Sequence, residues 1–94
     1  MQQQYSVCKW VTPVDLNPNN CLFGGRLLQW IDEEAALFLS LQLGSRRIAT
    51  KFISSIEFLT APKRGDIVEI NFSVIHVGNT SINLSCRVIN KITL

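Results

Sequence analysis

A glycine pair and an acidic residue stand two helical turns apart in the stretch CLFGGRLLQWIDEEAA, residues 21–36. Gly24 and Gly25 open an apolar run. The first N–H groups of a helix have no internal partner, and glycine has no side chain to keep a ligand oxygen away. Asp32 comes four residues after Leu28, so it borders the apolar face of the same helix. These residue types predict chemistry at a carbonyl polarised by the helix start.

The spacing limits how these groups can act together. Asp32 lies roughly 10–12 Å along the helix axis from the glycine pair, too far to reach a carbonyl held at the first N–H of its own helix. Either a later glycine N–H holds the carbonyl and it enters obliquely, or the carboxylate comes from a second copy of the helix, which requires a dimer. The acidic triplet 32–34 also fits a solvated helix face, and the residues alone leave these interpretations open.

Cysteine and histidine offer little for other catalytic chemistry. The three cysteines, Cys8, Cys21 and Cys86, form neither a disulfide framework nor a metal-binding pattern. The single histidine, His76, is predicted at the far end of a strand, so we expect no Cys–His pair. Cys21 is better interpreted as a small loop residue that packs against the helix start.

Length and charge narrow the class of protein. The 94 residues fit one domain over 1–94, and the formal net charge of +2 is too small for a nucleic-acid surface. The basic pairs Arg46-Arg47 and Lys63-Arg64 fit either phosphate contacts or solvated loops. The sequence has no run of about 18 apolar residues and no signal-peptide layout at its start, so we expect a cytoplasmic protein without a membrane partner.

One helix and several strands must position these residues. The helix is expected over residues 24–43, with Gly44 as its stop. Its predicted inward face is Leu28, Ile31, Ala35 and Leu39, and its outward residues are Arg26, Gln29, Glu33 and Ser40. Strands are expected in QQQYSVCKWV, RIATKFISSIEFL, DIVEINFSVIHV and SINLSCRVI, with a hairpin turn at Gly78-Asn79. Because the last two strands alternate, one sheet face needs a cover, which predicts an α+β domain with the sheet curled around the helix.

The stretch NPNNCLFGGRLLQWIDEEAA resembles the signature of hotdog-fold acyl-CoA thioesterases, the cytosolic acyl-CoA hydrolase (YciA-like) group. The resemblance continues through RRIATKFISSIEFLTAPKRGDIVEINFSVIHVGNTSINLSCRV. It implies an antiparallel sheet around a long central helix, and hydrolysis of acyl-CoA to coenzyme A and a carboxylic acid. It implies no cofactor, because coenzyme A is part of the substrate. The implied assembly is a homodimer or a trimer of dimers, with active sites at the dimer interface.

The resemblance also assigns roles to residues. Asp32 matches the catalytic carboxylate, a general base on water or a nucleophile, and Gly24 and Gly25 match the glycines whose N–H groups receive the thioester oxygen. Thr50 matches a strand position that faces the site across the dimer. The other expected substrate-binding residues are Asn20 beside the helix start, the basic pair Lys63 and Arg64 for phosphates, and the hairpin Gly78, Asn79, Thr80 and Ser81 for the nucleotide part of coenzyme A.

Departures from the family pattern favour a second hypothesis, a hotdog module that binds acyl-CoA or serves in assembly without turnover. Cys21 stands where relatives often have Asn or Asp, and Asn79 where many have a basic residue. Relatives usually continue through another strand after INLSCRVINK, so the last strand of the fold is expected to be missing. A dehydratase of the same fold, acting on acyl carrier protein, is disfavoured because His76 is misplaced.

Overall fold

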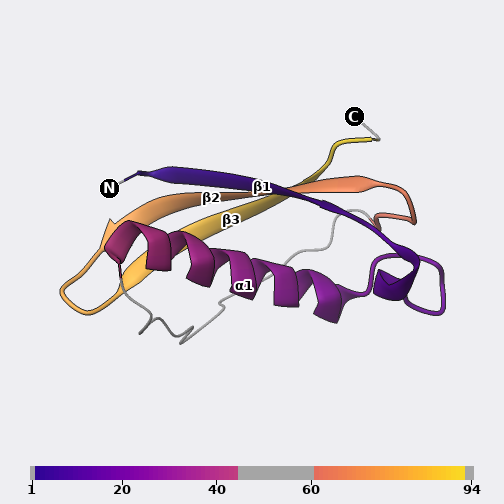
Figure 1. Cartoon of the computed structure of the whole chain (residues 1–94), viewed down its shortest axis with the longest axis horizontal. Coiled ribbons are helices and arrows are strands. Elements are labelled where there is room, and N and C mark those ends of the chain that lie inside the picture. The colour runs from indigo at the N-terminus through magenta and orange to yellow at the C-terminus, as the bar shows by residue number, and fades with distance from the viewer. Residues whose placement is uncertain (1, 45–60, 93–94) are drawn as a thin grey trace.

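The computed structural model describes residues 2–44 and 61–92. Its elements in chain order are the strand β1 (Gln4–Trp10), the short 3-10 turn η1 (Pro13–Asp15), the helix α1 (Gly24–Leu43) and the strands β2 (Ile67–Val77) and β3 (Ile82–Asn90). The strands form an antiparallel sheet in the order β1-β2-β3, and α1 lies along one face of it (Figure 1). This part of the chain therefore has the predicted α+β layout of a helix on an antiparallel sheet.

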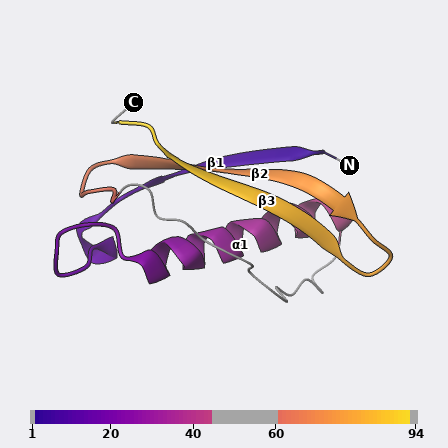
Figure 2. The same ribbon diagram turned by 180° about the vertical axis from the view of Figure 1, so that it is seen from behind.

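The sheet has an apolar face toward α1 and a polar face away from it, because successive side chains of a strand point to opposite sides. On β2, Val68, Ile70 and Phe72 are at most 1% exposed and belong to the core. The intervening residues Glu69 and Asn71 point to the other face. The view from behind in Figure 2 shows the same two layers, with β3 in front of α1. The pairing of β2 with β3 shifts register between Val74 and His76.

Aromatic side chains join the two layers. The ring of Tyr5 on β1 stacks on Phe38 of α1, with ring centroids 5.1 Å apart, and lies 6.2 Å from Phe72 of β2. The core is completed by residues from the loops and the helix start, so it extends from the loop before α1 to Phe38. The buried apolar residues are Val11, Leu22, Leu27, Trp30, Phe38, Val68, Ile70 and Phe72.

The helix α1 has the predicted bounds but not the predicted inward face. It covers Gly24–Leu43, and Gly44 ends it in the left-handed conformation with φ 62°. The buried helix residues are Leu27, Trp30, Glu34 and Phe38, whereas the predicted inward residues Leu28, Ile31, Ala35 and Leu39 are half-buried.

The most buried face of α1 is about one residue of helix rotation away from the predicted one, because apolar residues one position apart satisfy the same three-and-four spacing. Ile31, Ala35 and Leu39 of the predicted face still pack against the core. Trp30 and Phe38 account for the observed rotation, since aromatic side chains bury the most apolar area when they point at the sheet. The strand predicted in RIATKFISSIEFL falls outside the described residues.

Candidate active site

The start of α1 leaves two backbone donors open. Phe23 is the N-cap residue, and its side chain makes no capping hydrogen bond. The carbonyl oxygen of Phe23 accepts from the N–H groups of Arg26 at 3.0 Å and Leu27 at 3.1 Å. Within residues 2–44 and 61–92, no acceptor receives the N–H of Gly24 or Gly25. An anionic or polarised oxygen is the natural ligand of such donors at a helix start.

Asp32 lies two turns further along α1, on the flank of the helix rather than on its buried face. It is exposed and sits between the half-buried Leu28 and Ala36, one turn away on either side. Gly25 and Asp32 are seven residues apart and so lie on nearly the same side of α1, about 10 Å apart along its axis. The predicted position of Asp32 beside apolar residues is confirmed, and the unbroken helix places it two turns after the glycine pair.

A second carboxylate, Glu34, was not singled out by the sequence analysis, and it lies on the buried face. It is 7% exposed. The hydroxyl of Tyr5 donates to its Oε1 at 3.4 Å, and the amine of Lys9 lies 3.9 Å from its Oε2. Burial and the neighbouring Glu34 carboxylate raise the pKa of Tyr5. Its spacing could have predicted its burial, because Glu34 is four residues from both Trp30 and Phe38, the aromatic residues that define the inward face.

The loop before α1 is organised by an asparagine to which the sequence analysis assigned no role. Asn17 is half-buried, and its Oδ1 accepts from the backbone N–H of Asn19 at 2.9 Å and of Cys21 at 3.1 Å. Its own N–H donates to the carbonyl of Cys21 at 2.7 Å. Asn20 takes a positive φ of 62° at the tip of this turn, a conformation that asparagine tolerates better than most residues. Asn17 therefore fixes the shape of the loop that leads into the glycine pair.

This loop meets the segment before β2 and encloses a hollow. Cys21 pairs with Lys63 in an isolated antiparallel bridge, and the N–H of Leu22 donates to the carbonyl of Pro62 at 2.7 Å. The hollow has a volume of about 400 Å³ and is lined by Leu16, Asn20, Lys63 and Arg64. Three predicted substrate-binding residues, Asn20, Lys63 and Arg64, therefore line one hollow, and two of them are cationic. None of the described residues that line it is acidic.

The segment that carries Lys63 and Arg64 is held by a carboxylate. Asp66 Oδ2 accepts from the backbone N–H of Lys63 at 2.9 Å and from the side-chain amide of Asn90 at 3.0 Å. These two hydrogen bonds lower the pKa of Asp66 below its ordinary value. The turn therefore keeps its shape while both basic side chains remain exposed to solvent.

The predicted hairpin residues lie at the opposite end of α1. The turn between β2 and β3 holds Gly78, Asn79, Thr80 and Ser81, and the N–H of Gly78 donates to the carbonyl of Ser81 at 2.8 Å. Figure 1 shows this turn near the end of α1 that carries Leu43, whereas the hollow adjoins the start of α1. A 20-residue helix is about 30 Å long. Within one chain, the expected substrate-binding residues that the structure describes therefore lie in two groups, one near each end of α1. Thr50 falls outside the described residues.

Other candidate chemistry is not assembled in the described part of the chain. Cys21 lies in the loop before α1, whereas the exposed His76 lies at the end of β2 next to the hairpin, so no Cys–His pair forms there. Within the described ranges, no group of three or more His, Cys, Asp or Glu side chains could hold a metal ion. No helix of these ranges is long and apolar enough to cross a membrane.

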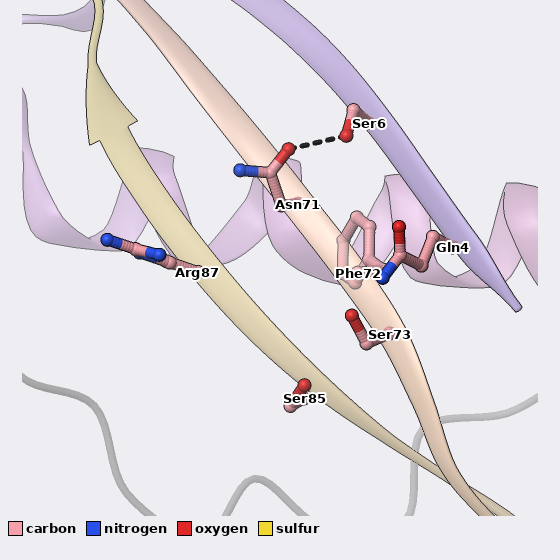
Figure 3. Close-up of a pocket in the computed structure, with 7 residues that line it drawn as sticks. All are labelled: Gln4, Ser6, Asn71, Phe72, Ser73, Ser85 and Arg87. Carbon is pink, nitrogen blue, oxygen red and sulfur yellow. Dashed lines mark hydrogen bonds between the residues drawn. The ribbon is translucent and has the colours of Figure 1, made fainter.

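A second hollow lies on the sheet face turned away from α1. It has a volume of about 330 Å³, and Figure 3 shows its polar side chains in front of the sheet with the helix behind. The hydroxyl of Ser6 donates to Oδ1 of Asn71 across β1 and β2 at 2.5 Å. None of the predicted site residues that the structure describes lines this hollow. Its lining is Gln4, Ser6, Asn71, Phe72, Ser73, Ser85 and Arg87.

Comparison with known proteins adds a family and several relatives. The model of the thioesterase superfamily matches residues 19–93. An uncharacterized acyl-CoA thioester hydrolase of Buchnera aphidicola subsp. Baizongia pistaciae is 32% identical over 76 residues, covering 81% of this chain and 56% of that protein. The uncharacterized acyl-CoA thioester hydrolase YkhA of Bacillus subtilis is 32% identical over 81 residues, covering 86% of this chain and 46% of that protein. The chain thus spans about half the length of these curated relatives.

Solved structures have the same arrangement. A hexameric acyl-CoA thioesterase in its apo form superposes with a TM-score of 0.85 at 33% identity, covering 96% of this chain and 58% of that one. An acyl-CoA hydrolase from Staphylococcus aureus, bound to butyryl coenzyme A, coenzyme A and coenzyme A disulfide, gives a TM-score of 0.83 at 29% identity, covering 93% and 52%. The staphylococcal enzyme has also been solved with an aspartate, an asparagine or a threonine replaced by alanine.

Proposed function

Since the chain belongs to the thioesterase superfamily, we propose that it hydrolyses the thioester of an acyl-CoA to coenzyme A and a free carboxylic acid. The expected hotdog fold is confirmed by the match to hotdog thioesterase structures at TM-scores of 0.83 and 0.85. The observation that carries the proposal is the start of α1, where, within the described residues, the N–H groups of Gly24 and Gly25 have no acceptor, together with the exposed carboxylate of Asp32 on the same element.

These groups divide the reaction between them. Water attacks the thioester carbon while Asp32 takes one of its protons as general base. The charge that develops on the carbonyl oxygen is stabilised by the N–H groups of Gly24 and Gly25. The carbon–sulfur bond then breaks, and the proton held by Asp32 passes to the departing thiolate of coenzyme A. The products are the carboxylic acid and the free thiol, and the reaction needs no cofactor, because water is the co-substrate.

Asn17 and Thr50 complete the proposed site. Asn17 precedes Asp32 by fifteen residues, which is also the separation between the asparagine and the aspartate replaced in the staphylococcal enzyme. The Asn17 Oδ1 is occupied within its own loop, so its amide N–H₂ is the group available to a substrate. We assign Thr50 a position facing the site across the dimer.

We place the phosphates of coenzyme A in the hollow of Lys63 and Arg64, with Asn20 at its rim. The hairpin Gly78, Asn79, Thr80 and Ser81 would contact the nucleotide from a second copy of the chain, because it lies at the far end of α1 from that hollow. Asp32 of one copy would likewise serve the glycine pair of the other, because about 10 Å along the helix axis separates these groups within one chain. We therefore propose a cytoplasmic homodimer, arranged as a trimer of dimers, and the hexameric neighbour supports this assembly.

Subunit mixing tests both the reaction and the shared site. Thiol release from a panel of acyl-CoAs establishes whether the protein turns over. Asp32→Asn and Gly25→Val, each inactive alone, are then mixed as unfolded chains and refolded together. If each site combines Asp32 of one copy with the helix start of the other, half of the dimers are mixed and each holds one intact site, so about a quarter of the wild-type rate returns. No recovery would place the site within a single chain.

The second hypothesis is a module that binds acyl-CoA without hydrolysis. Cys21 favours it, because its thiol is a weak donor and lies 3.6 Å from the carbonyl of Asn19 within the loop. Under this hypothesis, coenzyme A binds with the same affinity to the wild-type protein and to Asp32→Asn, and neither releases thiol from any acyl-CoA. Detectable turnover that Asp32→Asn abolishes excludes it.

A further inference from the structure

A buried carboxylate stands directly behind the start of α1. Asp15, the last residue of η1, is 3% exposed. Its Oδ2 accepts from the backbone N–H of Thr12 at 2.8 Å and from the hydroxyl of Thr12 at 2.7 Å, and its Oδ1 accepts from Nε of Arg26 at 2.9 Å. Burial alone would raise the pKa of Asp15, but these hydrogen bonds and the charge of Arg26 hold it below its ordinary value. The carboxylate is therefore ionised and fully partnered.

The main chain of Asp15 holds the helix start as well. Its carbonyl oxygen accepts the N–H of Phe23, the N-cap residue, at 2.9 Å. Phe23 immediately precedes the glycine pair, and its own side chain caps nothing. The direction of the open Gly24 and Gly25 donors thus depends on a hydrogen bond to Asp15. The loop that contains Asn17 begins directly after Asp15, at Leu16. Asp15 therefore adjoins both this loop and the start of α1.

Arg26 connects Asp15 to the first turn of α1. Besides its bond to Asp15, its Nη1 donates to Oε1 of Gln29 at 2.8 Å, and the guanidinium lies 5.4 Å from the centroid of the Trp30 ring. The guanidinium thus contacts Asp15, Gln29 and the Trp30 ring, and its positive charge neutralises the carboxylate whose main chain holds the helix start. Without that cation, the negative charge of Asp15 would oppose the negative charge that develops on a thioester oxygen bound there.

We propose that Asp15 and Arg26 are positioning residues for thioester hydrolysis: their ion pair orients the Gly24 and Gly25 N–H donors and neutralises the carboxylate behind them. This inference rests on the proposed function. Neither residue touches the substrate. The pair acts through the helix start, so its loss changes the rate of the chemical step more than the binding of coenzyme A.

Arg26→Gln tests the proposal, with Arg26→Lys as the conservative variant and Lys91→Gln as a matched control. Lys91 also forms an ion pair, 3.6 Å from Glu69, but away from the helix start. We expect Arg26→Gln to lower kcat roughly 10-fold to 100-fold, the scale of a displaced catalytic group, with the Kd of coenzyme A changed less than about 3-fold. Arg26→Lys keeps the charge and should recover part of kcat. Lys91→Gln should leave kcat unchanged.

Amide NMR separates failure of this inference from failure of the proposed function. Asp15→Asn weakens the same ion pair from nine positions away in the sequence, so it should shift the amide resonances of Gly24 and Gly25, whereas Lys91→Gln should not, whether or not the protein turns over. Unshifted glycine amides, or an unchanged kcat in a folded Arg26→Gln protein, would overturn the positioning role. The positioning role would also be overturned if Arg26→Gln keeps the wild-type kcat and loses kcat/KM only through a higher KM. Absence of turnover in the wild-type protein, with the glycine shifts present, overturns only the hydrolase assignment and the rate effect that depends on it.

Discussion

Asp32 and Glu34 are two positions apart on α1 and lie in opposite environments. Glu34 is 7% exposed and faces the sheet, with the Lys9 amine and the Tyr5 hydroxyl near its carboxylate. Asp32 is exposed on the flank of the helix. Two residues correspond to about 200° of helix rotation, so the two carboxylates point to different sides. The difference separates an acid that is paired between helix and sheet from one that is exposed to solvent.

Asp15 extends the comparison beyond the helix. Like Glu34 it is buried and paired with a cation, and like Glu34 it joins two elements, in this case η1 and α1. A buried charge without its partners would cost several kcal/mol, roughly, so both acids are bound to their positions. Substitutions on the buried side should therefore change stability, and those on the exposed side should change chemistry.

The largest expected effect is on the rate of hydrolysis, when the exposed carboxylate of Asp32 is replaced. Asp32→Asn should lower thioester hydrolysis by roughly 10²-fold or more, because a positioned general base is lost. The melting temperature should hardly change, since the side chain is exposed and asparagine has nearly the same shape. Thiol release and thermal unfolding measure the two quantities. Glu33→Gln is the control, because Glu33 is also exposed and accepts a hydrogen bond from the side-chain amide of Gln29 on the surface of the helix. A greater loss of rate in Glu33→Gln would move the catalytic role to that residue.

The next effect is on the buried side and is one of stability. Glu34→Ala leaves the Lys9 amine without its acid and should lower the free energy of unfolding by about 2 kcal/mol, less than for a fully buried pair, because the Lys9 side chain is 30% exposed. Urea unfolding measures it. The double variant Lys9→Met with Glu34→Leu should regain most of the loss, since no charge is then left unpaired. A 10²-fold loss of hydrolysis with unchanged stability would contradict a structural role for Glu34.

Gly25→Ala tests whether hydrolysis requires close approach of an oxygen to the N–H groups at the start of α1. A methyl group there would lie 3.1 and 3.3 Å from ring atoms of Phe23. We expect about a 10-fold lower rate, because the methyl group also restricts the approach of an oxygen to the N–H. Helix stability should not fall, since alanine is the better helix former. Adding Phe23→Leu relieves the ring contact. If that double variant regains the full rate, the crowding of Phe23 and not the approach to the donors is the cause.

The smallest expected effect concerns the hollow beside the helix start. The Kd of coenzyme A should rise several-fold, about 3 to 10 times, between low and high ionic strength, because exposed charges are screened by salt. Replacing both Lys63 and Arg64 by Gln should weaken binding and remove most of this dependence. Lys91→Gln is the control for a general loss of positive charge. If the Kd of coenzyme A depends equally on salt in the wild-type protein, the double variant and Lys91→Gln, then Lys63 and Arg64 do not contact its phosphates.

Local chemistry in the sequence determined the elements and the family. The bounds of α1 followed from the glycine pair, the apolar spacing and Gly44, and β2 and β3 from strict alternation on either side of a Gly-Asn turn. These are short-range effects, because caps, turn residues and periodicity act over a few positions. The candidate site was found the same way, since Gly24, Gly25 and Asp32 belong to one continuous stretch.

Tertiary structure decided which side of that helix is buried and what lies beside its start. Apolar spacing fits two neighbouring rotations of α1, and only packing of Trp30 and Phe38 on the sheet places Glu34 inside and Asp32 outside. The Asp15–Arg26 pair and the hollow of Asn20 with Lys63 join segments distant in the chain. Such contacts form because folding brings separate segments together to bury apolar area, and nothing in the local order of residues records which partner each will meet.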